Sequence, residues 1–417
     1  MRKMLLFVLV ALIFLTSCSN VGTENQDSTD SNTDNAQKNY DHEQSTVHMG
    51  STAVFTDDTI YFTSAGQLKY ADKASGIGGP LCGKPECLHN NDTCNAYIGF
   101  PGDPELSDYD GALYWWENDD KVEAHAYKVN YDGTGRELVR DLEGITTNTG
   151  APNSSFVHRG YMFFSYQTWK VVDGETVFGA RILAYDLNSN EECITVYEKD
   201  YGDTVYRPVI QAYENYLYIM LPIGERQWQI EAGMSREEHD PALEMYRWNI
   251  ETHELETLFN GDVPFNTNMG ELHIMDSGIL ISGGIIDYSD PYLLADWDIY
   301  SYDFESKEIS QYLELNGMGF YSVQIVNGLF IGSMFGEINR PMISVIDLSG
   351  KTILDKEYSP DFMNKYDIRS GFNFYGADED NLYYHLGGYD EKEDELVVAF
   401  PLDGSDPLVV YSRKGDG

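Results

Sequence analysis

The residues with the most specific chemistry are three cysteines and one histidine in the first quarter of the chain. Cys82, Cys87, His89 and Cys94 follow the spacing C-x4-C-x-H-x4-C. Three thiolates and one imidazole form a closed tetrahedral zinc site, which leaves no open position for a substrate. The pattern therefore predicts a structural zinc site that staples a loop, with these four residues as the metal ligands.

The same cysteines also fit two other states. The chain has five cysteines, and without Cys18 an even number remains, which in an exported protein also suits two disulfide bonds. One of those bonds would have to reach Cys193, which lies two repeats further along the chain. His89 favours a metal, because a disulfide framework has no use for a histidine. Free thiols are the third alternative.

The remaining residues form no recognised catalytic motif. The sequence has no Ser nucleophile elbow, no His-Glu-x-x-His helix and no Gly-rich phosphate loop. Its acidic loops lack the Gly and terminal Glu of an EF-hand, so we expect no calcium site. Whether the protein is an enzyme is left open, and binding is the stronger expectation. Trp228 is the candidate for an exposed aromatic residue that binds a ligand.

The charge of the chain excludes one class of partner. Lys and Arg number 27 against 69 Asp and Glu, which gives a formal net charge of −42. Proteins that bind DNA or RNA neutralise phosphates with basic side chains. We therefore expect no nucleic acid partner, and a bare anionic bilayer is a poor partner for the same reason.

The first residues have the pattern of an export signal. Residues 1–17 contain Arg2 and Lys3, then a short apolar run, then small residues before Cys18. The run is shorter than the roughly 20 residues that span a bilayer. The sequence Leu-Thr-Ser-Cys18 resembles the lipobox of bacterial lipoproteins, which implies cleavage before Cys18 and a diacylglyceryl group on its sulfur. An ordinary secretory signal is the alternative.

A polar segment follows the signal. Residues 18–47 are rich in Ser, Asn, Asp, Thr, Gln and Glu and contain few apolar residues. A segment with so few apolar side chains cannot bury enough apolar surface to offset the conformational entropy that it would lose on folding. We therefore expect a disordered acidic tether that holds the following domain away from a membrane.

The rest of the chain repeats and supplies the elements that position the cysteines. A short apolar strand returns about every 50 residues, and in most repeats a second strand follows that ends in an Asp or Asn turn. Four antiparallel strands in about 50 residues form one blade of a β-propeller. The predicted fold class is all-β, a seven-bladed β-propeller of four-stranded antiparallel blades over residues 48–412. The repeated strands are 59–62, 112–116, 161–164, 216–219, 278–281, 328–331 and 381–385.

Two segments depart from the repeat. The Cys-rich insertion 76–106 stands where the fourth strand of the first repeat would be, so the pattern predicts no fourth strand there. The insertion 225–243 in the fourth repeat is predicted to be a loop or short helix, and it contains Trp228. Residues 413–417 are a C-terminal tail.

Signal, tether, repeats and Cys-rich segment together resemble the uncharacterised extracellular β-propeller lipoproteins of Gram-positive, Clostridia-type bacteria. The resemblance implies a protein on the outer face of the cytoplasmic membrane, in contact with the membrane through its lipid alone. We expect a binding or scaffold protein that uses a propeller face or its central channel to bind a glycan or a protein. The alternative is an exported propeller-fold enzyme, a hydrolase or lyase that acts on glycans.

Overall fold

The computed structural model describes most of the repeat region. The described residues are 52–98, 103–118, 123–145, 152–202, 207–223, 242–265, 271–286, 295–320, 322–334, 342–358, 372–387 and 394–414. The signal, the tether with Cys18, and residues 225–241 with Trp228 lie outside this range, so the expectations for them stay predictions. No helix long and apolar enough to cross a membrane occurs in the described residues.

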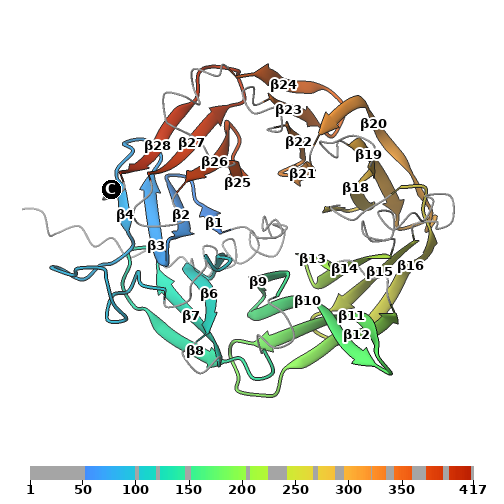
Figure 1. Ribbon diagram of the computed structural model, residues 1–417, viewed down its shortest axis with the longest axis horizontal. Coiled ribbons are helices and arrows are strands. Elements are labelled where there is room, and N and C mark those ends of the chain that lie inside the picture. Colours follow the sequence, from blue (N-terminus) through green and yellow to red (C-terminus); the bar gives the residue numbers. More distant parts are fainter. Residues whose placement is uncertain are drawn as a thin grey trace, which may run out of the picture. The chain divides into compact units, whose positions relative to one another are not determined.

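The elements in the described residues are 28 β-strands, which form seven sheets of four strands each. Every sheet is built from four strands that are consecutive in the chain, and neighbouring strands run antiparallel. The sheets are arranged as the blades of a propeller, with the first strand of a blade toward the centre and the fourth at the rim (Figure 1). The predicted fold class is therefore confirmed.

The first four blades cover the chain to Asp262. Blade 1 has β1 (Ala53–Phe55), β2 (Thr59–Ser64), β3 (Gln67–Asp72) and β4 (Gly78–Pro80). Blade 2 has β5 (Ser107–Tyr109), β6 (Ala112–Asn118), β7 (Ala124–Asn130) and β8 (Glu137–Asp141). Blade 3 has β9 (Ser154–His158), β10 (Tyr161–Val172), β11 (Glu175–Asp186) and β12 (Ile194–Gly202). Blade 4 has β13 (Val209–Tyr213), β14 (Tyr216–Ile223), β15 (Ala242–Asn249) and β16 (Leu255–Asp262).

The last three blades complete the ring. Blade 5 has β17 (Leu272–Met275), β18 (Gly278–Ile286), β19 (Ala295–Asp303) and β20 (Ile309–Phe320). Blade 6 has β21 (Ser322–Val326), β22 (Leu329–Met334), β23 (Met342–Asp347) and β24 (Thr352–Glu357). Blade 7 has β25 (Phe372–Ala377), β26 (Asn381–Gly387), β27 (Glu395–Pro401) and β28 (Leu408–Arg413).

Each blade has an Asp or Asn at the same turn, between its third and fourth strands. In blade 6, Oδ1 of Asp347 accepts the N–H groups of Ser349 and Lys351 at 2.9 and 3.0 Å. A side chain that accepts backbone N–H groups in this way fixes the turn. The sequence repeat therefore corresponds to a repeated turn geometry. In the other blades, the Asp or Asn that accepts a backbone N–H group at this turn is Asp72, Asp132, Asp186, Asn249, Asp303 or Asp403.

Blade 1 differs from the sequence prediction, which gave it no fourth strand. Gly78–Pro80 pairs antiparallel with β3, and Pro80 lies opposite Lys69. Two glycines and a proline have low β-propensity, and proline is tolerated in an edge strand such as this one. The Cys-rich segment therefore follows a complete blade 1 and connects it to blade 2.

Apolar side chains fill the spaces between neighbouring blades. One cluster joins Phe163 of blade 3 to Trp248 of blade 4, with ring centroids 6.1 Å apart. Trp115, Trp248 and Trp297 are buried in such clusters, whereas Trp169 is 56% exposed. Most of the described tryptophans therefore serve as core residues between blades.

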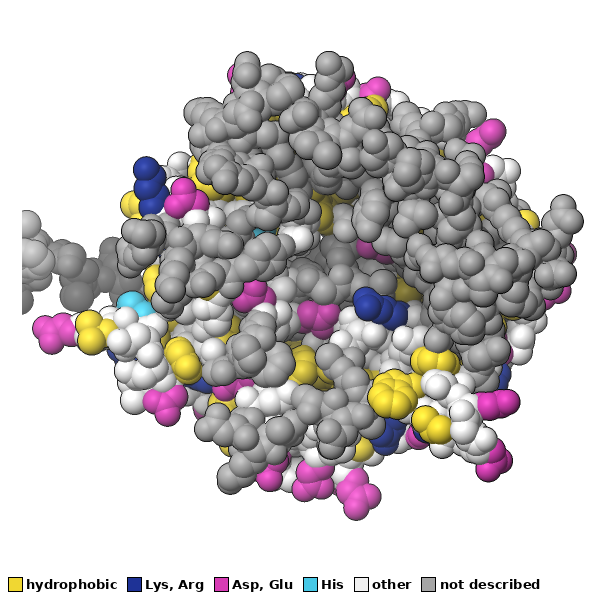
Figure 2. Space-filling view, in the orientation of Figure 1, with side chains coloured by type: hydrophobic (Ala, Val, Ile, Leu, Met, Phe, Trp, Pro, Cys, Tyr) yellow, Lys and Arg dark blue, Asp and Glu magenta, His cyan; other side chains and the backbone are white. Residues whose placement is uncertain are grey.

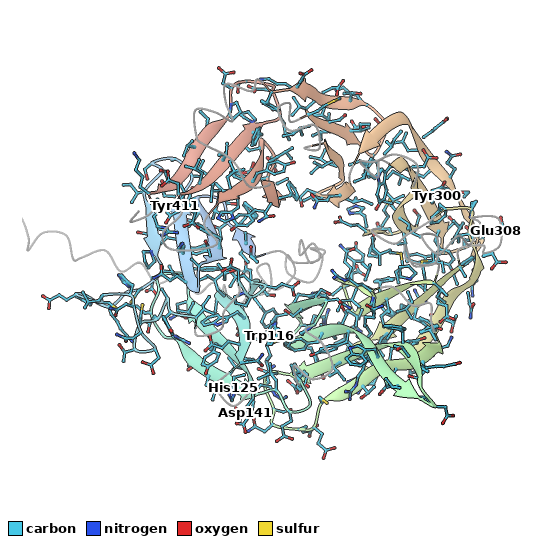
Figure 3. The ribbon with its side chains drawn as sticks, viewed as in Figure 1. Trp116, His125, Asp141, Tyr300, Glu308 and Tyr411 are labelled. Carbon is cyan, nitrogen blue, oxygen red and sulfur yellow. The ribbon has the colours of Figure 1, made fainter. Side chains whose placement is uncertain are left out.

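Blades 1 and 7 close the ring without sharing a strand. β1 belongs to the same sheet as β2, β3 and β4, and the last sheet contains β25 to β28 alone. The contact between these blades is made by side chains: Tyr411 of β28, labelled in Figure 3, lies edge-on to Phe62 of β2 with ring centroids 5.2 Å apart. Packing between blades therefore holds the two ends of the repeat region together.

Candidate metal centre

The four predicted ligands come together in the structure. One ligand atom from each of Cys82, Cys87, His89 and Cys94 lies within 4.8 Å of the others. Nδ1 of His89 is 3.2 Å from Sγ of Cys94. With Zn–S bonds of about 2.3 Å and Zn–N bonds of about 2.0 Å, tetrahedral ligand atoms are about 3.5–3.8 Å apart. Small shifts would enclose an ion, so the cluster could hold a metal such as zinc.

None of the described cysteines forms a disulfide bond. Cys82, Cys87, Cys94 and Cys193 are all free thiols. Cys193 packs against the apolar cluster between blades 2 and 3 and is not one of the four clustered ligands. The pairing of Cys193 with the Cys-rich segment, one of the alternatives from the sequence, is therefore not formed.

Local backbone geometry brings the middle ligands together. Glu86 and His89, on either side of Cys87, have φ of +61° and +57°. Residues with a Cβ atom adopt this left-handed conformation at a cost of about 1–2 kcal/mol. Backbone strain of this kind persists where the surrounding structure enforces it, often at binding sites. The two left-handed residues reverse the chain tightly enough for Cys87 and His89 to reach the same cluster.

Backbone N–H groups point at two of the sulfur atoms. The N–H of Ala96 donates to Sγ of Cys94 at 3.3 Å, and the N–H groups of Lys84 and Asn95 donate to Cys82. Burial alone would raise the pKa of Cys82, but these donors and the neighbouring thiols outweigh it and lower that pKa. Cys82 is therefore prepared for the thiolate form that binds a metal.

The pKa of Cys94 is shifted in the opposite direction. Its side chain is buried, and burial, with the nearby thiols of Cys87 and Cys82, raises its pKa to about 12. Thiols packed together in this way ionise fully only when a cation offsets their charge, because a coordinating thiol is deprotonated outright. Binding of a metal at the cluster would therefore be coupled to ionisation of Cys94.

The segment that carries the ligands is hydrogen bonded to blade 2 through Gly133. The carbonyl oxygen of Gly133 accepts the N–H of Gly83 at 3.0 Å and Nδ2 of Asn95 at 2.6 Å. Gly133 has φ of +75°, and a Cβ atom there would lie 2.7 Å from the backbone nitrogen of Cys82. A glycine is needed at this position because the turn and the Cys-rich segment approach so closely.

Arg136 forms a second link to blade 2. Its guanidinium donates to the carbonyl oxygens of Cys94 and Tyr97 at 3.0 and 2.6 Å. The same group donates to Glu117 of β6 at 2.9 Å, and it lies 5.6 Å from the ring centroid of Trp115. Arg136 thereby fixes the chain that leaves the last ligand against the core of blade 2.

The segment is also bound to blade 1. Nε2 of Gln67 donates to the carbonyl oxygen of His89 at 2.9 Å, and the N–H of Leu68 donates to that of Ala96 at 2.7 Å. The N–H of Leu81 donates to the carbonyl oxygen of Leu68 at 2.8 Å. A metal held by the four ligands would therefore brace the junction between blades 1 and 2.

The spacing in the sequence predicted that Cys82, Cys87, His89 and Cys94 lie together, but it did not indicate the residues that hold their segment in place. Gly133 follows Asp132 in a turn that occurs in every blade. A glycine is ordinary in such a turn, so the sequence gives no reason to expect that Gly133 contacts the Cys-rich segment. Arg136 lies in an ordinary β-hairpin, and no local signal relates it to Cys94. One feature of the sequence could have drawn attention to Arg136. It is a basic residue in a strongly acidic chain, in which Arg is rare.

Comparison with known proteins identifies no family for this chain. No family model matches the sequence, and no curated protein matches it. A prolyl endopeptidase structure matches 87% of this chain at 14% identity with a TM-score of 0.49, and this chain spans about half (49%) of that enzyme. The propeller domain of the Trilobed protease from Pyrococcus furiosus matches 86% of this chain and 98% of that domain at 13% identity, with a TM-score of 0.44.

An oligogalacturonate lyase solved with manganese is a third similar structure. It matches 84% of this chain and 85% of the lyase at 12% identity, with a TM-score of 0.43. The seven four-stranded sheets define the fold, and one fold serves many functions. The protein is a β-propeller protein, and its fold is compatible with binding and with catalysis.

Proposed function

We propose that the protein is a lipid-anchored extracellular binding or scaffold protein whose propeller is braced by a structural zinc ion. The observation that carries the proposal is that the ligand atoms of Cys82, Cys87, His89 and Cys94 lie within 4.8 Å of one another. Four protein ligands complete a tetrahedral zinc site. The ion would therefore stabilise the junction of blades 1 and 2 and take no part in catalysis.

A braced ring suits a binding protein. Loops on a rigid scaffold carry most binding sites, because the scaffold fixes their positions. The hydrogen bonds of the Cys-rich segment to Gln67 and Leu68 on one side, and to Gly133 and Arg136 on the other, would let the ion limit movement between two blades. The proposed ligand is a glycan or a protein that binds one face or the channel.

Anchoring and location rest on the sequence. The signal 1–17, Cys18 at its end and the tether 18–47 have the order found in propeller lipoproteins of Gram-positive, Clostridia-type bacteria. Acidic side chains are spread around the margin of the face drawn in Figure 2, and the net charge is −42. Repulsion from anionic headgroups would keep the propeller away from the membrane surface, so that the lipid on Cys18 alone holds the protein there.

Elemental analysis of the full chain, purified under reducing conditions, tests the metal. We expect about one zinc ion per chain, and loss of that zinc in Cys94→Ser and His89→Ala. Cys193→Ser is the matched control, because Cys193 is a free thiol outside the cluster, and it should retain the zinc. Native protein without zinc, or equal loss in Cys193→Ser, would show that the metal proposal is wrong.

A second experiment tests the anchor. Labelling of cells with a fatty acid should mark the native protein, and Cys18→Ala should be unlabelled and released from the membrane. Membrane retention of Cys18→Ala at the native level would contradict the lipid anchor while leaving the metal site unaffected.

A further inference from the structure

Blade 3 contains a cavity that neither the metal centre nor the anchor uses. Its volume is about 160 Å³, and it is lined by residues of β10, β11 and β12 and by Gly144, which follows β8 of blade 2. Pockets for drug-sized ligands have volumes of about 300–1,000 Å³. This cavity is smaller, so it suits a ligand part about the size of one ring.

The polar side chains of the cavity lie on one face of the blade 3 sheet. Tyr166, Thr168 and Lys170 alternate along β10, and side chains two residues apart in a strand share a face. Arg181 of β11 lies directly opposite Tyr166 on one side and Glu198 of β12 on the other. Directly opposed residues share a face, so these five residues share one face of the sheet, and all five line the cavity.

Two hydrogen-bond donors on residues that line the cavity have no hydrogen-bond partner in the part of the chain that the structure describes. The hydroxyl group of Tyr166 and Nε of Arg181 are buried and unpaired, and the Tyr166 side chain is 3% exposed. Nε of Arg181 is 3.6 Å from Glu198, too far for a hydrogen bond. Burial raises the pKa of Tyr166, so its hydroxyl group keeps its proton and can donate. Few buried donors stay unpaired in native proteins, and both of these donors belong to residues that line the cavity.

The mouth of the cavity offers acceptors and carries no net charge. Nζ of Lys170 lies 2.5 Å from Oδ2 of Asp200, and both side chains are about half exposed. Together with Arg181 and Glu198, these residues give the lining two positive and two negative charges. The charge of the lining therefore favours neither an anionic nor a cationic ligand. A ligand would have to accept from Tyr166 and Arg181 and donate to Glu198 and Asp200. A hydroxyl group does both.

We propose that this cavity binds a single neutral sugar unit of a glycan through its hydroxyl groups. A sugar ring carries several adjacent hydroxyl groups, so one unit can pair with donors and acceptors at once. The proposal deepens the binding function proposed above, on which it rests for an extracellular ligand. It does not depend on the metal, because none of the four metal ligands lines the cavity.

The test is binding of the full chain to an array of neutral oligosaccharides, with uronate-terminated oligosaccharides as a second arm. We expect binding in the neutral arm. Tyr166→Phe should weaken the affinity about tenfold, while its thermal midpoint stays the same or rises, because the change removes an unpaired buried hydroxyl group. Tyr358→Phe is the matched control: Tyr358 also has a buried, unpaired hydroxyl group, but it packs between blades 6 and 7 and should leave the affinity unchanged.

Three results would overturn the sugar site. They are no binding in the neutral arm, preference for the uronate arm, and equal affinity of Tyr166→Phe and Tyr358→Phe. The third result would remove the site and keep the binding function, since a glycan would still bind. If neither arm binds, the sugar class is wrong, and a pull-down with the same full chain then decides separately whether a protein is bound.

Discussion

Nζ of Lys69 lies 2.7 Å from Oε2 of Glu395, and this ion pair joins the first and last blades of the propeller. The side chains are 2% and 0% exposed. Glu395 also accepts from Nε of Arg413 at 2.9 Å, and Nε2 of His385 lies 3.2 Å from its other oxygen. Beside the apolar contacts, a buried charged network therefore closes the ring.

Glu395→Gln should destabilise the protein strongly. The change leaves Lys69 and Arg413 without the carboxylate that offsets their charge in a buried site, and breaking a buried ion pair typically costs about 3–5 kcal/mol. We expect a loss of that size in the free energy of unfolding at pH 7, measured by urea denaturation.

Lys128→Met is the control for this experiment. It breaks the ion pair of Lys128 with Glu137, whose side chains are 34% and 58% exposed. Exposed pairs contribute less than about 1 kcal/mol, so the free energy of unfolding should change little. Equal effects of the two substitutions would show that the network at Glu395 is not a major contributor to ring closure.

Acid should weaken the protein through Glu395. Burial alone would raise the pKa of this carboxyl group, but His385, Lys69 and Ser64 lower it from 4.5 to about 2. Above pH 4.5 the carboxylate is ionised in both states and its stabilising effect is complete. Between pH 4.5 and 2 the unfolded chain binds the proton first, so the free energy of unfolding falls by about 3 kcal/mol. Urea denaturation across this range should show a smaller fall in Glu395→Gln, and equal slopes would contradict the assignment.

Removal of the metal should loosen one junction of the ring. When a chelator takes zinc from the cluster, we expect faster hydrogen exchange at the N–H groups of Leu68 and Gly83, which bond to Ala96 and Gly133. The N–H of Ile281 in blade 5 should exchange at an unchanged rate. Lower pH should release the metal as well, because its thiolate ligands must be deprotonated. Uniform acceleration of exchange in all blades would argue against a local brace.

Gly133→Ala should lower zinc affinity. A methyl group there meets the backbone nitrogen of Cys82 at 2.7 Å, whereas at Gly111 nothing lies within 4 Å. Both glycines have φ of +75°, so Gly133→Ala and Gly111→Ala share a backbone cost of about 1–2 kcal/mol. The displacement of Cys82 should add about a tenfold loss of zinc affinity in Gly133→Ala alone, measured by competition with a chelating dye. A similar loss in Gly111→Ala would assign the effect to backbone strain.

Local patterns were enough to predict the blades and the clustering of the three cysteines with His89. Asp303 and Asp347 lie at equivalent turns of two different blades. Such turns can be recognised in the sequence, because a few adjacent residues determine the conformation of a turn. Cys82 and Cys94 are close enough in the sequence for their spacing alone to indicate a common site. β4 was missed because Gly and Pro dominate its three residues.

Contacts between distant segments could not be predicted in this way. Lys69 and Glu395 are 326 residues apart, and no pattern near either residue identifies the other. The alternation of Tyr166 and Thr168 along β10 shows that they share a face. Whether the hydroxyl group of Tyr166 finds a partner depends on how blade 2 packs against blade 3, which is a property of the whole ring.

Closure by side chains has a consequence for the order of folding. Since each sheet consists of four strands that are consecutive in the chain, a blade can form as soon as its own segment has been synthesised, with the N-terminal blades first. No strand of blade 1 has to wait unpaired for the C-terminus. The long-range contact between Lys69 and Glu395 forms last, because Glu395 belongs to the seventh blade. By then the six earlier sheets have formed, so the ring closes between blades that are already folded.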